Sequence, residues 1–352
     1  MAVLVSAFDR LRDDRLVESV KLSNAQGTEV TLLTLGATIQ SFIYDGKDIV
    51  LGFDRASDYF ASGAYIGATV GRVCNRTADG VFSLNGIEYI LQCNEVERRV
   101  HLHGGMVGFD KKIWECTILE DGDEPSAAFE MCSEDGDEGY PGNLRVRLVY
   151  TLTADNALTL DYTATCDTDT PLNLTNHVYF NLNGCDGGTV KNHLLRIAAE
   201  EYTPVTERLV PTGEFAPVAD TCIDFRQFKT IGEALDGTDA CMEYTGGVDH
   251  NFVLAHNRRP LSEAAVAYSP VTSIRVTCCT DLPGIQVYTG NFLEENGGKY
   301  GLNWGKHHGF CLETQFFANS VNEPRFPSII LKGGDIFTSR TIYRIDKVGE
   351  DK

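Results

Sequence analysis

Alternation of apolar and polar residues, interrupted by turn-forming residues, is the feature that most constrains how this chain can fold. Residues 146–152 and 158–164 each carry an apolar side chain at every second position, and Ala154-Asp155-Asn156 lies between them. Successive side chains of a β-strand point to opposite faces, so this pattern is typical of strands with one buried face. The two runs therefore predict a β-hairpin.

Two dipeptides predict further hairpins. Asp45-Gly46 separates the strand-like runs 38–44 and 48–53, and Asn85-Gly86 separates the runs 81–84 and 87–91. Both dipeptides favour the type I′ turn, which joins neighbouring antiparallel strands.

Helical periodicity is confined to two short stretches, residues 54–60 and 228–235. Strand-like runs arrive about every 8 to 12 residues, a spacing typical of sandwiches. We therefore predict an all-β fold, mainly β with few short helices, built as a large antiparallel β-sandwich. No linker-like segment, charge run or repeat divides the chain, so we expect one domain over residues 1–352.

The charge balance argues against polyanionic partners. Fifty acidic and thirty basic residues give a formal net charge of −20, which repels nucleic acid and anionic membrane surfaces. We therefore expect a neutral small molecule as the ligand, with no nucleic acid and no membrane as partner. No stretch approaches transmembrane length.

The cysteines and the N-terminus bear on the compartment. The eleven cysteines form no Cys-x-x-Cys pair, and an odd number cannot be fully bridged within one chain, which favours reduced thiols. The apolar run at residues 2–5 is too short for a signal peptide. Both observations predict a cytoplasmic protein.

The common cofactor and metal motifs are missing from the sequence. No Gly-x-Gly, Gly-Lys-Ser/Thr or Gly-x-Ser-x-Gly occurs, which argues against a dinucleotide, a phosphate loop and a nucleophile elbow. A metal site is conceivable at His101-Leu102-His103, but no His-Glu-x-x-His or cysteine pair supports it. We expect neither a cofactor nor a metal.

Two segments carry residues suited to acid–base chemistry. Asn176–Leu182 surrounds His177 with aromatic and amide side chains, and Cys311–Gln315 places Glu313 in an apolar stretch. Histidine is the side chain that changes charge most readily near neutral pH, and carboxamides hydrogen-bond hydroxyl-rich ligands. The two segments predict a sugar-binding site with an acid and a base.

Other polar clusters lie at Gly71-Arg72-Val73-Cys74-Asn75-Arg76, Leu102-His103-Gly104-Gly105, Val248-Asp249-His250-Asn251-Phe252 and Gln286-Val287-Tyr288-Thr289-Gly290-Asn291. Each cluster alone has a structural explanation, such as an ion pair, a buried histidine or a turn cap. In their order along the chain, together with Asn-His-x-Tyr-Phe-Asn-Leu and Leu-Glu-x-Gln, they resemble the aldose 1-epimerases, also called galactose mutarotases. The resemblance covers nearly the whole chain.

The resemblance implies roles for particular residues. His177 is the implied general acid and Glu313 the implied general base. Because a free histidine is mostly neutral at pH 7, we expect nearby carboxylates to hold His177 partly charged. Arg76, His103 and Asp249 are the implied contacts to sugar hydroxyls or the ring oxygen, and Asn75 and Gln286 are further substrate-binding candidates. The family's fold is a large β-sandwich, the galactose mutarotase-like supersandwich, which agrees with the strand pattern.

The sequence departs from the family pattern at three positions. Thr77 replaces an isoleucine, Val248 stands where an aromatic residue often occurs, and Thr314 replaces a proline. None of these changes removes a reactive group, but they leave substrate preference and loop geometry open.

We therefore expect an aldose 1-epimerase that interconverts the α and β anomers of free hexoses such as galactose and glucose, as a monomer or weak homodimer. Three alternatives remain. A sugar-binding or regulatory protein on the same scaffold would catalyse nothing, a hexose-6-phosphate mutarotase would need a cluster of basic residues, and a glycosidase or lyase could use Asp249 as a second carboxylate. The main hypothesis requires residues 177 and 313 to share one cavity.

Overall fold

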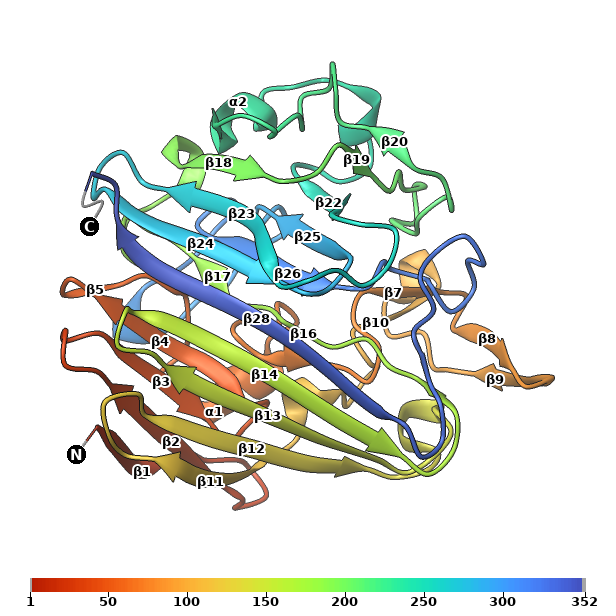
Figure 1. The fold of residues 1–352 in the computed structure, drawn as a ribbon, viewed down its shortest axis with the longest axis horizontal. Coiled ribbons are helices and arrows are strands. Elements are labelled where there is room, and N and C mark those ends of the chain that lie inside the picture. The colour runs from red at the N-terminus through yellow and green to blue at the C-terminus, as the bar shows by residue number, and fades with distance from the viewer. Residues whose placement is uncertain (1, 350–352) are drawn as a thin grey trace.

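The computed structural model describes residues 2–349, and antiparallel β-strands dominate it (Figure 1). The largest sheet has nine strands in the order β11 (Glu115–Glu120), β12 (Ser126–Ser133), β13 (Leu144–Leu152), β14 (Ala157–Cys166), β28 (Ile336–Lys347), β24 (Ile274–Thr280), β23 (Ser262–Tyr268), β18 (Leu194–Ile197) and β21 (Lys229–Thr230). It runs diagonally across Figure 1.

Two further large sheets accompany it. One has six strands in the order β17 (Tyr179–Phe180), β26 (Phe310–Gln315), β25 (Gly284–Tyr288), β22 (Asp249–Val253), β19 (Glu201–Tyr202) and β20 (Ala216–Pro217). The other has five, β1 (Val3–Arg10), β2 (Leu16–Ser23), β3 (Glu29–Leu33), β4 (Thr38–Tyr44) and β5 (Lys47–Asp48).

Four two-stranded pairs complete the sheets among the described residues. They are β7 (Arg76–Ala78) with β10 (Val100–Leu102), β6 (Thr69–Val70) with β16 (Thr175–Asn176), β8 (Val81–Leu84) with β9 (Ile87–Ile90), and β15 (Thr170–Pro171) with β27 (Ile330–Leu331). The β8–β9 hairpin extends from the body of the molecule at the right of Figure 1.

The three large sheets meet in one apolar core. Leu148 on the nine-stranded sheet, Leu32 on the five-stranded sheet and Phe310 on the six-stranded sheet belong to the same cluster of buried side chains. Burial of such side chains removes apolar surface from water and is the main driving force of folding. The prediction of a large antiparallel β-sandwich is confirmed.

The sequence-predicted hairpins form. Strands β13 and β14 pair from Leu144↔Cys166 to Leu152↔Leu158. The dipeptides Asp45-Gly46 and Asn85-Gly86 both have positive φ at each residue, as a type I′ turn requires. Beyond β5, the predicted strand 48–53 continues only as single bridges, Val50 with Phe180 of β17 and Phe53 with Gly298, and residues 49–53 are buried.

The helices are short. The described α-helices are α1 (Ala56–Ala61) and α2 (Ile231–Leu235), within or near the two predicted stretches, and α2 begins with a capping box between Thr230 and Glu233. The part of the chain that the structure describes also has the 3-10 helices η1 (Val96–Arg98), η2 (Phe109–Lys111), η3 (Asp137–Gly139), η4 (Val190–Asn192), η5 (Ala240–Met242) and η6 (Lys299–Gly301). Between residues 2 and 349 there is no helix with the length and apolar character needed to cross a membrane.

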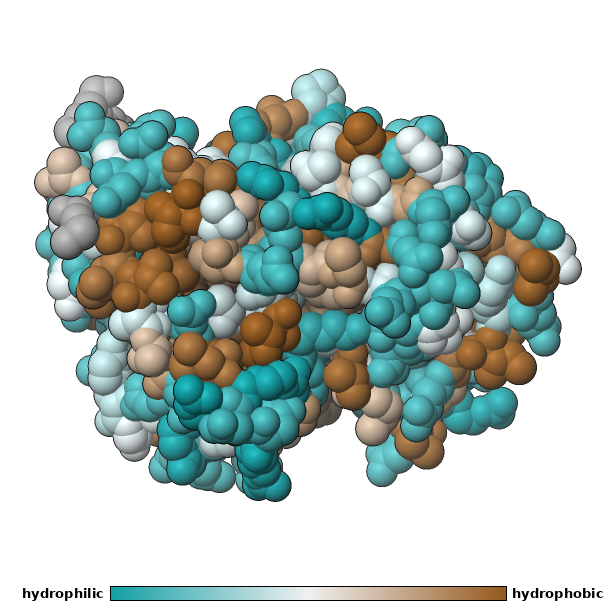
Figure 2. Space-filling model, turned by 90° about the horizontal axis from the view of Figure 1, so that it is seen from below, coloured by the Kyte–Doolittle hydropathy of each residue, from teal (hydrophilic) through white to brown (hydrophobic). Residues whose placement is uncertain are grey.

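The surface carries separate apolar patches. Figure 2 shows one face on which hydrophilic residues cover most of the area and hydrophobic residues gather in several places. The edge strands β1 and β11 expose Leu4, Val5, Ile118 and Leu119. Exposed edge strands are where a second chain can pair most easily.

Candidate active site

One face of the six-stranded sheet carries polar side chains, because alternate residues of its strands point the same way. Gln286 on β25 pairs with Glu313 on β26, and Asp249 on β22 pairs with Tyr288 on β25. The intervening Leu312 belongs to the apolar core. The sheet therefore presents one face to the core and the other to a cavity.

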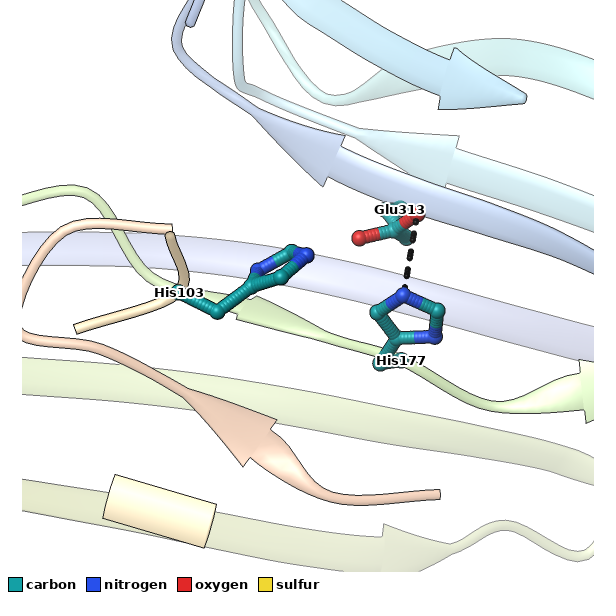
Figure 3. A group of neighbouring side chains, drawn as sticks. All are labelled: His103, His177 and Glu313. Atoms are coloured by element: carbon teal, nitrogen blue, oxygen red, sulfur yellow. Dashed lines mark ion pairs between the residues drawn. The ribbon is translucent and has the colours of Figure 1, made fainter. Parts of the chain in front are cut away.

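The same register brings His177 to Glu313. Tyr179 on β17 pairs with Cys311 on β26 in an antiparallel register, so His177, two residues before Tyr179, lies opposite Glu313, two residues after Cys311. Their side chains point toward each other in Figure 3, and His177 Nε2 lies 3.7 Å from Glu313 Oε1. Two residues that are remote in sequence thus form a close pair.

The opposite wall comes from β7, β10 and the residues beside them. Asn75 and His103 both have left-handed backbone conformations and hold each other by two hydrogen bonds. The His103 N–H donates to the Asn75 carbonyl (3.0 Å), and the Asn75 N–H donates to His103 Nδ1 (3.2 Å). Because Nδ1 accepts, a neutral His103 carries its proton on Nε2. One ring nitrogen of His103 points toward His177 and Glu313 in Figure 3.

A cavity of about 360 Å³ lies between these walls, within the size range of small-molecule sites. All seven residues for which the sequence predicts a role line it, namely Asn75, Arg76, His103, His177, Asp249, Gln286 and Glu313. The tertiary structure therefore gathers segments that are separated by more than two hundred positions in the printed sequence.

Aromatic rings fix the orientation of the His177 imidazole. The ring lies between Tyr65 and Tyr179, with centroid distances of 6.0 Å and 5.1 Å and an interplanar angle of 28° to each. The Cys311 thiol lies 3.5 Å from His177 Nδ1. With Nδ1 beside this thiol, Nε2 is the nitrogen that faces Glu313.

Burial shifts both members of the pair toward their neutral forms. It lowers the pKa of His177 to about 4 and, reinforced by the nearby Asp249 charge, raises the pKa of Glu313 well above its ordinary value, although Arg76 opposes this. The pair's proton therefore resides preferentially on Glu313 when the cavity holds no ligand. Carboxylates do not keep His177 charged here, because burial lowers its pKa and a protonated Glu313 has no negative charge.

Ion pairs and hydrogen bonds hold the other polar groups. Arg76 Nε donates to Glu95 Oε2 at 2.8 Å, and Arg98 also pairs with Glu95. Gln286 Nε2 donates to Asp249 Oδ1 at 2.6 Å. Each substrate-binding candidate on these walls is therefore oriented by a neighbour before any ligand arrives, which lowers the entropy cost of binding.

Glu313 Oε2 is buried and has no hydrogen-bond partner among residues 2–349. A buried carboxylate oxygen without a partner is costly, and a hydroxyl group of a ligand in the cavity is a suitable donor to it. The site thus fits a ligand rich in hydroxyl groups.

Among residues 2–349, His101 does not join His103 in a group of possible metal ligands, and it does not line the cavity. His101 is buried, and its Nδ1–H donates to the Gln92 carbonyl at 2.8 Å. His103, His177 and Glu313 do offer ligand atoms within 4.8 Å of one another. However, the nitrogen that His103 has free carries a proton, which suits donation to an oxygen and opposes metal coordination.

Arg72, in the segment Gly71–Arg76 that also contains Asn75 and Arg76, has a structural function. Its side chain is buried and does not line the cavity. Its guanidinium group donates to the carbonyls of Ser133, Glu134, Pro141 and Gly142 and to the hydroxyls of Ser133 and Thr170. Arg72 thus fastens several loops together.

The three departures from the family pattern lie beside the cavity. Thr77, Val248 and Thr314 are buried, and none of them is among the residues that line it. The Thr314 hydroxyl bonds to that of Thr341, on the far side of β26 from the cavity. A direct effect of these residues on sugar preference therefore has no support in the structure.

Several lining residues escaped the sequence analysis. Tyr179, one of the aromatic residues beside His177 in the sequence, lines the cavity, and Tyr288 could have been found because it lies two positions from Gln286 on the same strand face. Tyr65, Glu95 and Phe292 also line the cavity. Nothing in their local sequence distinguishes them from surface residues.

Comparison with known proteins gives consistent results. Residues 18–344 match the family described as Aldose 1-epimerase. The galactose mutarotase of Sus scrofa is 40% identical over 333 residues, 93% of each chain. The aldose 1-epimerase of Escherichia coli K12 is 35% identical over 330 residues, 92% of this chain and 93% of the relative.

Solved structures agree with the sequence relatives. The galactose 1-epimerase of Lactobacillus acidophilus superimposes with a TM-score of 0.87 at 28% identity and covers 98% of each chain. The aldose epimerase homologue from C. elegans superimposes with a TM-score of 0.85 at 32% identity, over 94% of this chain and 99% of the other.

Proposed function

This chain belongs to the aldose 1-epimerase family, and we propose that it interconverts the α and β anomers of free hexoses such as galactose and glucose. The observation that carries the proposal is the approach of His177 Nε2 to Glu313 Oε1, 3.7 Å apart in one cavity. Relatives named galactose mutarotase and aldose 1-epimerase support the same activity. The enzyme is accordingly a sugar isomerase.

The reaction requires two proton transfers, one at each of the two oxygen atoms bonded to the anomeric carbon of the sugar. The anomeric O1 loses its proton while the ring oxygen gains one, and the ring opens to an aldehyde. Rotation about C1–C2 and reclosure with both transfers reversed give the other anomer. Glu313 acts as the general base at O1, and His177 acts as the general acid at the ring oxygen. Both oxygens are bonded to C1, so two groups a few ångström apart can reach them together.

The pair carries one proton through the whole cycle. Ring opening moves the pair's proton from His177 to the sugar and takes another onto Glu313, and closure returns both. Because the proton prefers Glu313 when no sugar is bound, the bound sugar must favour its transfer to His177. Sugar hydroxyl groups that donate to the Glu313 carboxylate favour this transfer, because hydrogen bonds to the charged form of a group stabilise that form. The positive charge of Arg76 acts in the same direction.

The remaining predicted residues bind the sugar. Arg76 and the His103 Nε2–H can donate to sugar oxygens, and Asp249 accepts from hydroxyls. Asn75 supports His103 through its backbone, and Gln286 orients Asp249. Held in this geometry, the sugar reaches the acid and the base without the entropy cost of a random encounter.

The ion pairs favour a free hexose over a hexose 6-phosphate. Arg76 and Arg98, the guanidinium groups that line the cavity, both pair with Glu95. A substrate phosphate would have to compete with the Glu95 carboxylate for these two guanidinium groups. The net charge of −20 would also repel the phosphate.

Polarimetry tests the activity. Freshly dissolved α-D-galactose and α-D-glucose should approach equilibrium rotation faster with the protein than without it. An unchanged rate would indicate a sugar-binding protein without catalytic activity. Acceleration confined to hexose 6-phosphates would indicate a hexose-6-phosphate mutarotase. Release of monosaccharide from a disaccharide would instead indicate a glycosidase.

We further propose a single domain over residues 1–352, a monomer or weak homodimer, and a cytoplasmic location. The apolar core supports one domain, because it joins Val3 near one end to Ile345 near the other. The exposed edges of β1 and β11 would allow weak self-association. The eleven free thiols are compatible with a reducing compartment.

A further inference from the structure

Two cysteines lie against each other outside the cavity. Cys222 Sγ and Cys241 Sγ are 3.8 Å apart, although the residues are 19 positions apart in sequence. Cys222 is buried, and Cys241, in η5, is partly exposed. The sulfur atoms of a disulfide lie about 2.05 Å apart, so closure requires an approach of roughly 1.8 Å.

The surrounding structure holds the two thiols together. The Cys222 N–H donates to the Asp239 carboxylate on the segment that leads to Cys241. Lys229 Nζ donates to the Cys222 carbonyl at 2.8 Å. Gly237 permits the tight approach of this segment, because a Cβ at that position would lie 2.2 Å from Cys222 Cβ. The contact is therefore built by several interactions around both cysteines.

A hydrogen-bonded path leads from Cys241 to the sugar cavity. His250 Nε2–H donates to the Cys241 carbonyl at 2.9 Å. The Asp249 N–H donates to His250 Nδ1 at 3.1 Å, and the Asp249 carboxylate lines the cavity and accepts from Gln286. His250 is fully buried, so its ring cannot be displaced without disturbing Asp249.

We propose that Cys222 and Cys241 form a reversible disulfide whose closure weakens sugar binding by displacing Asp249 through His250. The disulfide itself is independent of the proposed function, whereas its effect on sugar binding rests on that function. The turnover number should change less than KM, because Asp249 acts on Glu313 through its charge alone and His177 does not contact His250 or Asp249.

The oxidant is a low-molecular-weight disulfide such as glutathione disulfide. The thiolate of Cys241 attacks one sulfur of the oxidant, which forms a mixed disulfide and releases one glutathione thiolate. Cys222 then loses its proton and attacks Cys241 Sγ, and the second glutathione leaves. Two protein thiols are oxidised and one glutathione disulfide is reduced to two thiols. Burial raises the pKa of both thiols, that of Cys222 to about 12, and Cys241 reacts first because it is the more exposed of the two.

The experiment compares full-length enzyme equilibrated with glutathione disulfide and with dithiothreitol at mildly alkaline pH. Peptide mapping without reduction should show a 222–241 cross-linked peptide only in the oxidised sample. Polarimetry should show a KM raised about threefold or more, the size expected for weakening one hydrogen bond to the sugar. The turnover number should stay within about twofold, and dithiothreitol should reverse the change.

Three variants separate the possible outcomes. Cys222→Ser and Cys241→Ser should each abolish the rise in KM, whereas Cys132→Ser, which removes an exposed thiol on β12, should retain it. Absence of the cross-linked peptide in oxidised wild-type enzyme would overturn the redox site. A cross-link with unchanged KM would overturn its connection to the cavity. If the reduced enzyme has no turnover, the proposed function fails separately, and the peptide map still decides the disulfide.

Discussion

Replacing Glu313 with glutamine removes the proposed base while preserving the shape of the side chain. A positioned proton transfer is worth about 10²- to 10⁴-fold in rate, which corresponds to about 2.7–5.4 kcal/mol of transition-state free energy. Glutamine cannot take the O1 proton, so Glu313→Gln should lower the turnover number at least about a hundredfold. Sugar binding should change less, because the amide can still hydrogen-bond hydroxyl groups.

The same substitution should leave the fold intact. Glu313 is 1% exposed, and its Oε2 has no hydrogen-bond partner among the described residues. An unsatisfied buried polar group costs about 1–3 kcal/mol, more when charged. Glu313 already carries the pair's proton when no sugar is bound, so a neutral amide of the same shape should keep the free energy of unfolding within about 1 kcal/mol of the wild type. Active sites often hold groups that are unfavourable for stability.

Polarimetry with α-D-galactose, corrected for spontaneous mutarotation, measures the turnover number, and denaturant unfolding measures stability. Glu200→Gln is the matched control, because it removes an exposed carboxylate that pairs with Arg226 on the surface, where such pairs contribute little. The control should match the wild type in both measurements. A fall of less than tenfold in Glu313→Gln would refute the assignment of Glu313 as the base.

Three other predictions follow from the geometry. The pH profile of kcat/KM should be bell-shaped, because activity needs one proton on the pair of His177 and Glu313. The value of kcat/KM should fall below about pH 4, where His177 takes a second proton. It should fall again at higher pH as the proton leaves Glu313, whose pKa is raised. A profile without an alkaline limb would contradict the acid role. Glu95→Gln should raise KM about tenfold with little change in kcat, because Arg76 loses its charged partner; an equal fall in kcat would argue that Glu95 acts in the chemistry. Arg72→Met should lower the free energy of unfolding by about 3 kcal/mol or more, since it leaves buried carbonyls without a donor, and denaturant unfolding near the wild-type midpoint would contradict this.

Much of the fold was predictable because its signals are local. Alternation over residues 146–164 and the positive-φ dipeptides at 45–46 and 85–86 each depend on a few neighbouring residues. The run 49–53 has the local pattern of a continued hairpin strand, but it bridges to Phe180 and Gly298 instead, and no local pattern reports such distant partners.

The charge state of the site was not predictable. The sequence favoured a partly charged His177 because carboxylates were expected near it. Burial decides otherwise, and the degree of burial depends on Tyr65 and Tyr179, which cover the ring from both faces. No local pattern reports how completely a side chain will be covered by residues elsewhere in the chain.

The sequence by itself determined the strands, their alternating faces and the chemical types available to the site, because propensity and periodicity act over a few residues. Only the tertiary structure decided which groups meet. Cys311 contacts His177 across 134 positions of sequence, and Glu95 reaches Arg76 from a separate loop. The proton affinities of His177 and Glu313 follow from these long-range contacts and from the exclusion of water, since electrostatic energies depend on the surroundings of a group in space.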